Sequence, residues 1–343
     1  MGQVISKLTI KGYKSIRNLE NFELRNINIL IGPNGGGKSN FLSFFEFVLK
    51  CVEGKDEFDV YVQKQGGADQ LLYLGSKTTR EITISFSFTP KADFIKIFDV
   101  TSDNRLIDKT PALPVRGISK KGVVEILNFL RKIRKEWHFN DTSDFARVKL
   151  PNSEGNYDFL FPDASNMAPF LFRMKEKQPR YYQAIIEVIR LAAPFFDNFK
   201  FDINEQGDVK WWWSQKGSDY QFLPSQISDG TLRFICLATA LLQPDPPSTI
   251  LLDEPELGLH PYALTLLAGL IQKASIKTQV IVSTQSAALI DHFQPEDIVI
   301  VERQDGESIF KRLKKEELNV WLDDYSLGEL WQMNVVGGRP ARE

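Results

Sequence analysis

One eight-residue segment constrains the fold of this chain more than any other feature. Residues 32–39, Gly-Pro-Asn-Gly-Gly-Gly-Lys-Ser, have the spacing G-x-x-x-x-G-K-[ST]. The segment follows Ile-Asn-Ile-Leu-Ile at 27–31, which predicts a buried strand, and precedes apolar residues at helical spacing from 39 to 52. In such a strand–loop–helix unit, glycines let successive backbone N–H groups turn inward around phosphate oxygens. The sequence therefore predicts a phosphate-binding loop.

The residue types in this loop indicate the bound species. Lys38 can reach the β- and γ-phosphates, and the Ser39 hydroxyl is a ligand for Mg²⁺. We therefore expect ATP and Mg²⁺ as cofactors; a glycine-rich turn without a ligand is the alternative. The residues predicted to bind ATP here are Asn34, Gly35, Gly36, Gly37, Lys38, Ser39 and Asn40.

A second predicted strand, Thr-Ile-Leu-Leu-Asp at 249–253, ends in two adjacent carboxylates, Asp253 and Glu254. In a parallel sheet, we expect this strand to end beside the phosphate loop. Asp253 then suits a contact to Mg²⁺ through a water bound to the ion, and Glu254 suits a general base for an attacking water. A solvated turn would also place two acids at a strand end.

Composition excludes several other classes of protein. The chain has 343 residues and a formal net charge of −2, so any nucleic-acid surface must be a local patch. The two cysteines, Cys51 and Cys236, are too few for a disulfide framework, which favours a cytoplasmic location. No apolar run approaches the roughly 20 residues that a membrane helix needs, and no signal-peptide pattern is present.

The remaining segments are interpreted from their periodicity. Residues 53–80 are expected to be loop-like, 81–88 to form a strand, and 199–214 to form a hairpin with its turn at 206–208. The triplet at 211–213 is all tryptophan, and in a strand Trp212 points opposite to its neighbours. Packing of at least one face is therefore favoured over base stacking.

Several segments resemble the ABC-type ATPases of the RecF/SMC class. Residues 252–261 (LDEPELGLHP) are similar to the Walker B and D-loop segment, 10–16 (IKGYKSI) to the opening strand and turn, and 228–231 (SDGT) to the signature motif. Within the class, the chain most resembles compact stand-alone AAA-family ATPases related to the ATPase half of OLD-type nucleases. The runs 325–331 (YSLGELW) and 337–340 (GGRP) also match that group.

The resemblance implies an ABC/SMC-type P-loop NTPase head. This α/β fold has a mostly parallel sheet flanked by helices, an antiparallel β part and a helical insertion, without a long coiled coil. The expected domains are an N-terminal ATPase lobe at 1–90, a mainly helical insertion at 91–200, and a C-terminal ATPase lobe at 201–343.

The resemblance also implies a homodimer with nucleotide sandwiched between two copies. Ser228 and Gly230 would contact the γ-phosphate in trans. The switch position, usually His in this class, is Gln285 here; it can bond a phosphate or a water but cannot carry a proton, so hydrolysis would be slow or partner-dependent. Gln70 is the expected Mg²⁺-binding residue of the Q-loop, with Gln63 and Gln65 as rivals.

These features favour a dimeric ATPase that gates a separate effector protein, possibly a nuclease, or DNA, by resemblance in bacterial anti-phage defence. The alternatives are a RecF-like DNA repair clamp, a nucleotide-dependent scaffold with little turnover, and, less favoured, a transporter subunit. Residues 111–150 hold nine basic and four acidic residues. This local excess of positive charge fits either a solvated face or a contact with DNA or a protein.

Overall fold

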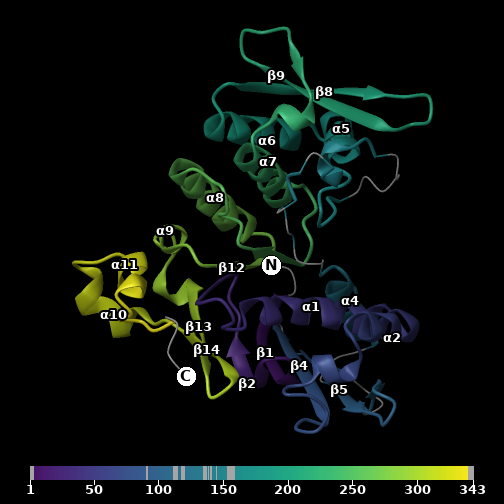
Figure 1. The fold of residues 1–343 in the computed structure, drawn as a ribbon, viewed down its shortest axis with the longest axis vertical. Helices are drawn as coiled ribbons and strands as arrows, with labels where there is room; N and C mark the ends of the chain where they lie inside the picture. Colours follow the sequence, from purple (N-terminus) through teal and green to yellow (C-terminus); the bar gives the residue numbers. More distant parts are fainter. Residues whose placement is uncertain are drawn as a thin grey trace. The chain divides into compact units, whose positions relative to one another are not determined.

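The computed structural model describes residues 4–89, 92–110, 115–116, 120–133, 137, 139, 141–143, 145–152 and 159–338. The chain forms two compact units, neither of which is continuous in sequence (Figure 1). The first comprises residues 1–136, 247–253 and 277–343, and the second 137–246 and 254–276. The segment 91–200, expected to be one insertion, is thus divided between the units and contains strands as well as helices. The domain boundaries at 90 and 200 remain a prediction.

A five-stranded sheet in the first unit positions the phosphate loop. Its strand order is β11 (Thr249–Asp253), β12 (Gln279–Thr284), β3 (Ile27–Ile31), β13 (Ile298–Gln304) and β14 (Glu307–Arg312). The first four strands are parallel, and β14 is antiparallel to β13. Every residue of β12 is buried, as expected for a parallel strand covered on both faces.

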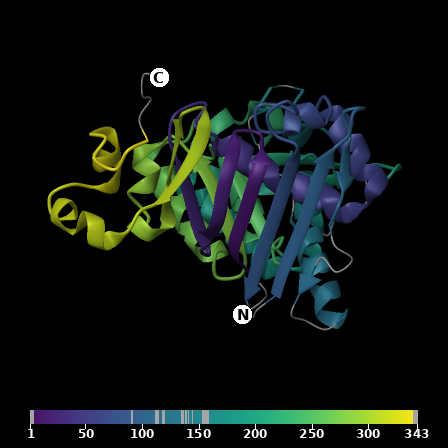
Figure 2. The same ribbon diagram turned by 90° about the horizontal axis from the view of Figure 1, so that it is seen from below.

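A second sheet of the first unit is antiparallel, and Figure 2 shows its purple and blue strands side by side. The order is β2-β1-β4-β5-β6, with β7 also paired to β5. Apolar side chains alternate along β4, where Ile82, Ile84 and Phe86 are buried. The strands are β1 (Val4–Tyr13), β2 (Ile16–Glu23), β4 (Glu81–Thr89), β5 (Ala92–Val100), β6 (Leu106–Asp108) and β7 (Val115–Arg116).

Helix α1 (Lys38–Glu53) is the core helix of the first unit. Its buried residues include four phenylalanines, and Phe47 packs edge-on against Phe58 of α2 with ring centroids 5.4 Å apart. The expectation that 53–80 is loop-like is wrong, because α2 (Lys55–Lys64) and α3 (Ala68–Leu71) lie there. The sparse apolar residues of α2 are stabilised by packing on α1 rather than by a strong local pattern.

The other helices that the structure describes in the first unit are α4 (Lys120–Arg131), α9 (Ala287–Ile290), η3 (Pro295–Asp297), α10 (Lys315–Leu322) and α11 (Leu327–Gln332).

In the part of the second unit that the structure describes, four α-helices accompany a three-stranded antiparallel sheet of order β10-β9-β8. The predicted hairpin is present, with Trp211 and Trp213 buried and Trp212 half-buried. The described elements of the second unit are η1 (Arg147–Lys149), α5 (Met167–Lys177), α6 (Pro179–Ala192), β8 (Phe196–Ile203), β9 (Val209–Gln215), β10 (Gln221–Phe222), η2 (Pro224–Gln226), α7 (Asp229–Leu242) and α8 (Pro261–Ala274).

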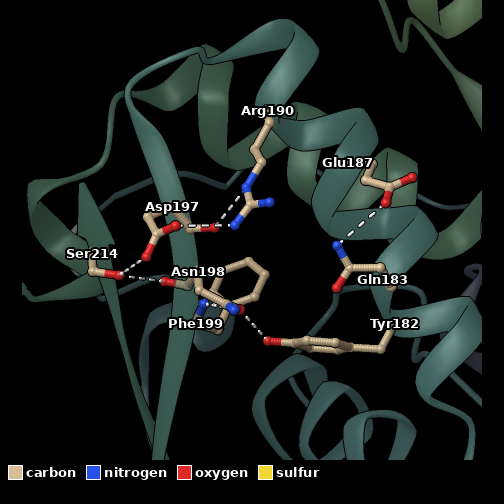
Figure 3. Close-up of polar contacts among 8 residues, drawn as sticks. All are labelled: Tyr182, Gln183, Glu187, Arg190, Asp197, Asn198, Phe199 and Ser214. Atoms are coloured by element: carbon tan, nitrogen blue, oxygen red, sulfur yellow. Dashed lines mark hydrogen bonds and ion pairs between the residues drawn. The ribbon is translucent and has the colours of Figure 1, made fainter. Parts of the chain in front are cut away.

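Polar contacts join α6 to this sheet (Figure 3). The Tyr182 hydroxyl donates to Asn198 Oδ1 at 2.7 Å. Arg190 donates from Nε to the Asp197 carbonyl at 2.9 Å and from Nη2 to its carboxylate at 3.0 Å. Asp197 also accepts from the Ser214 hydroxyl of β9 at 3.3 Å. The end of α6 is therefore fixed to β8.

Candidate functional site

The loop at 32–39 connects β3 to α1 in a conformation that only small residues allow. Gly35 and Gly37 have φ of +77° and +112°. A Cβ on Gly32 would lie 1.8 Å from the Val301 carbonyl oxygen, and one on Gly37 would lie 2.0 Å from Ser308 Oγ. Glycine is required here both for backbone conformation and for close approach.

The loop retains the donors that a polyphosphate needs. Gly37 is the N-cap of α1, a helix of 16 residues, and glycine has no side chain that could cap it. The N-terminal amides of α1 therefore have no side-chain cap. The Lys38 ammonium donates to the carbonyls of Gly32 at 2.7 Å and Pro33 at 3.0 Å, which holds the charge inside the loop. Ser39 and Asn34 are exposed. These features fit a nucleoside triphosphate with a bound cation.

Two serines outside the motif brace the loop. Ser15 Oγ accepts from Asn40 Nδ2 at 2.7 Å and from Ser308 Oγ at 2.7 Å, and the Ser308 backbone N–H donates to the Ser15 carbonyl at 2.8 Å. Ser15 lies at the β1–β2 turn and Ser308 on β14. Ser308 could not be predicted from the sequence, because no local pattern marks a residue about 270 positions along the chain from the loop that it contacts.

The carboxyl edge of the parallel sheet brings together two other predicted positions. Asp253 pairs in register with Ser283 of β12, which pairs with Leu30 of β3, so β12 separates the acidic strand from the loop strand. Strand β11 thus ends at the expected edge, one strand away from the loop rather than beside it. Gln285 directly follows β12, the strand that lies between them.

Ser283 is a further candidate at this edge. Its side chain is fully buried, and its hydroxyl has no hydrogen-bond partner among the residues that the structure describes. Since in-register neighbours on parallel strands project to the same face, Ser283 shares a face with Asp253. A buried hydroxyl without a partner is costly. A polar ligand or water at this edge would satisfy it.

Glu254 has an unusual backbone conformation. Its φ is +44°, in the left-handed region, which costs a non-glycine residue about 1–2 kcal/mol. The Leu257 N–H donates to the Glu254 carbonyl at 3.2 Å and closes a turn. Such strain persists where surrounding contacts enforce it, and it is frequent at functional sites.

Two of the three Q-loop candidates line a groove of about 560 Å³ in the first unit. Gln70, on α3, and Gln65 both line this groove together with Asn40 and Ser15, whereas Gln63 is not among its lining residues. The groove therefore places Gln70 near the first turn of α1, where the motif predicts the nucleotide, and leaves Gln65 as its rival.

The signature segment caps α7 in the second unit. Ser228 Oγ donates to Thr231 Oγ1 at 2.8 Å and accepts from the Thr231 N–H at 3.4 Å. A cavity of about 280 Å³ is lined by Ser228, Gly230 and His260, together with the last turn of α6. Ser228 and Gly230 are therefore together at an accessible helix end, as the motif predicts.

The remaining polar candidates give no separate site. Among the residues that the structure describes, no group of three or more His, Cys, Asp or Glu could hold a metal ion. Of the basic stretch at 111–150, Arg147 pairs with Asp163 at 3.5 Å and the Lys149 ammonium donates to the Thr142 carbonyl at 2.7 Å. Several other predicted positions lie outside the part of the chain that the structure describes. They are Arg134, Lys135, Arg339 and Pro340, and the side chains of Arg116, Lys120 and Lys121.

Comparison with known proteins yields a family match and a distant relative. Residues 27–291 match the family model described as "AAA domain, putative AbiEii toxin, Type IV TA system". A Helicobacter pylori protein named "ATP/GTP phosphatase" is 23% identical over 300 residues, covering 77% of this chain and 79% of that protein.

Solved structures of Smc head domains share the fold. One, the SmcHead bound to the C-winged helix domain of ScpA, is 17% identical with a TM-score of 0.63, covering 92% of this chain and 99% of that one. Another, bound to the C-terminal domain of ScpA derived from Pyrococcus furiosus, is 17% identical with a TM-score of 0.61 and covers 94% and 99%. These likenesses confirm the predicted fold class. Within the described residues, no helix combines the length and apolarity required to cross a membrane.

Proposed function

Because this chain belongs to the AAA domain family matched over residues 27–291 and is an ATPase with the Smc head fold, we propose that two copies close around ATP and reopen on hydrolysis. The observation that carries the proposal is the division of polar groups between the units. The phosphate loop lies in the first unit and the signature turn in the second. A γ-phosphate contacted by both copies would stabilise only the closed dimer.

The proposed chemistry uses the residues at the two helix ends and the carboxyl edge. The loop amides and Lys38 bind the β- and γ-phosphates, and Ser228 and Gly230 of the second copy contact the γ-phosphate. Glu254 accepts a proton from water as its oxygen attacks the γ-phosphorus, and ADP leaves. Gln285 orients that water without carrying a proton, which keeps turnover slow.

Mg²⁺, when bound, would neutralise charge on the phosphate oxygens. Ser39, Asp253 and Gln70 are the residues that we propose to hold it directly or through water. Oxygen donors of this kind suit a hard cation that retains several waters.

The decisive experiment is size-exclusion chromatography with light scattering on Glu254→Gln, with and without ATP and Mg²⁺. We expect the variant to bind ATP, to lose hydrolysis, and to double its mass only with ATP. The same variant with ADP is the matched control and should stay at the lower mass. Hydrolysis by Glu254→Gln at the wild-type rate would reject the assigned base, and an unchanged mass with bound ATP would reject the sandwich.

We further propose that closure gates a separate effector protein, in a cytoplasmic defence setting. The Smc heads of the same fold were solved bound to domains of a second protein, ScpA, and the family description names a toxin of a toxin–antitoxin system. Affinity capture with the trapped Glu254→Gln protein tests this against DNA. An ATP-dependent protein partner supports an effector, whereas ATP-dependent DNA affinity that falls steeply with salt would favour the repair-clamp alternative.

A further inference from the structure

The turn that begins at Glu254 is held from outside by helix α7. Arg233, on α7, donates from Nη1 to the Leu257 carbonyl at 2.8 Å. Leu257 in turn donates its N–H to the Glu254 carbonyl at 3.2 Å. The Arg233 guanidinium therefore bonds Leu257, the residue that closes this turn. Glu254, at the start of the same turn, has positive φ. Charged hydrogen bonds of this kind are stronger than neutral ones.

A second hydrogen bond fixes the orientation of the Arg233 guanidinium. Arg233 Nε donates to the Phe139 carbonyl at 3.1 Å, and Phe139 is buried. Two carbonyls from distant segments are thus bridged by one rigid, planar group, a role that a flexible ammonium fills poorly.

The start of α7 touches this turn as well. A Cβ on Gly230 would lie 2.3 Å from the Gly258 carbonyl oxygen, so the two backbones are in close contact. Gly258 itself has φ of +74°. The signature turn and the Glu254 turn therefore meet at two places, through the Gly230 backbone and through Arg233 one turn further along α7.

We propose that Arg233 is a positioning residue that sets the Glu254 carboxylate for catalysis and links it to the signature turn. This inference rests on the proposed function, in which Glu254 is the general base. When Ser228 and Gly230 engage nucleotide held by the second copy, α7 transmits that engagement to Glu254 of its own copy. Each nucleotide site of the dimer thereby influences the base that serves the other.

The test compares Arg233→Ala with Arg190→Ala. Arg190 is a matched control in the same unit, because it also bonds a backbone carbonyl, that of Asp197, but on β8 rather than the Glu254 turn (Figure 3). We expect Arg233→Ala to lower kcat about 10- to 100-fold, the range for a misplaced catalytic group. Its KM for ATP and its ATP-dependent dimerisation should change less than about 2-fold. Arg190→Ala should keep kcat within about 2-fold.

The variant Arg233→Lys distinguishes a loss of positioning from a loss of folding. Lysine keeps the charge and reaches one carbonyl, so kcat should lie between those of wild type and Arg233→Ala, while the thermal unfolding midpoint stays close to wild type. Equal kcat for Arg233→Ala and Arg190→Ala would overturn the inference, as would a loss seen in KM alone. A wild-type chain without ATPase activity, or an active Glu254→Gln, would instead refute the proposed function.

Discussion

The N-termini of helices α1 and α7 both lie at a predicted phosphate contact, but they are capped and held in place differently. Gly37 begins α1 without a side-chain cap, and the Lys38 ammonium rests on carbonyls of its own loop. Ser228 caps α7 through Thr231, and the turn beyond is fixed by Gly258 and Arg233. The first end is held by local glycine geometry and the second by contacts between distant segments.

This difference indicates how each end would respond to a ligand. The amides of α1 need no rearrangement to accept an anion, because no side-chain cap competes for them. Ser228 must share or give up its bond to Thr231 before its hydroxyl can donate to a phosphate. We therefore expect tight nucleotide binding by the first unit and a weaker, closure-dependent contact from the second.

Lys38→Ala should have the largest effect. It removes the cationic donor to the β- and γ-phosphates, and two charge-assisted hydrogen bonds are worth about 3–6 kcal/mol, at least 100-fold in Kd. Isothermal titration with ATP and Mg²⁺ measures the loss. Thermal unfolding without nucleotide is the control, since Lys38 also bonds two loop carbonyls. Undiminished ATP affinity in a folded Lys38→Ala protein would mean that the loop is not the nucleotide site.

Gly230→Ala should damage the second end through a backbone contact. The new Cβ would lie 2.3 Å from the Gly258 carbonyl, and we expect a loss of about 1–3 kcal/mol in unfolding free energy together with slower hydrolysis. The matched control is Gly269→Ala on α8, where no atom lies within 4 Å and the change should stabilise by about 0.5–1 kcal/mol. Equal stability of the two variants in urea would show that α7 and the Glu254 turn are not in contact.

The contrast between the two ends also explains what the sequence could predict. The loop strand, the loop and α1 lie within residues 27–53, so periodicity and glycine spacing were sufficient. The placement of Asp253 and Gln285 at one sheet edge followed from the rule that parallel strands end together. Helix α2 was missed because its stability comes from packing on α1, which no short window contains.

Arg233 and Ser308 were beyond prediction for the same physical reason. Arg233 bonds carbonyls at positions 139 and 257, and Ser308 bonds Ser15, so each acts through a contact set only by the tertiary fold. The left-handed conformation of Glu254 had no local signal either, because glutamate is not among the residue types, such as Asn, Asp and His, that are enriched in this region.

Ser228 offers a smaller test that separates its two roles. Ser228→Ala removes the cap and should cost about 1 kcal/mol of stability or less, since the bond to the Thr231 N–H is 3.4 Å long. Ser228→Asn keeps a capping side chain and should unfold like wild type. If the hydroxyl contacts nucleotide on the second copy, both variants lose ATP-dependent dimerisation, measured in the Glu254→Gln background. Normal dimerisation by Ser228→Asn would restrict Ser228 to its capping role.

Cys236 gives the smallest expected signal and reports on α7 directly. Its side chain is buried in the middle of that helix, and burial raises the thiol pKa to about 12. Because the thiolate is the reactive form, we expect no alkylation of Cys236 by iodoacetamide at pH 8 in the folded protein, and rapid alkylation in urea. Mass spectrometry of the peptide distinguishes it from Cys51. Gly230→Ala should speed labelling if the contact with Gly258 keeps α7 in place, whereas Gly269→Ala should not. Fast labelling of wild type would mean that α7 opens readily, and a helix that opens readily could not transmit nucleotide engagement to Glu254.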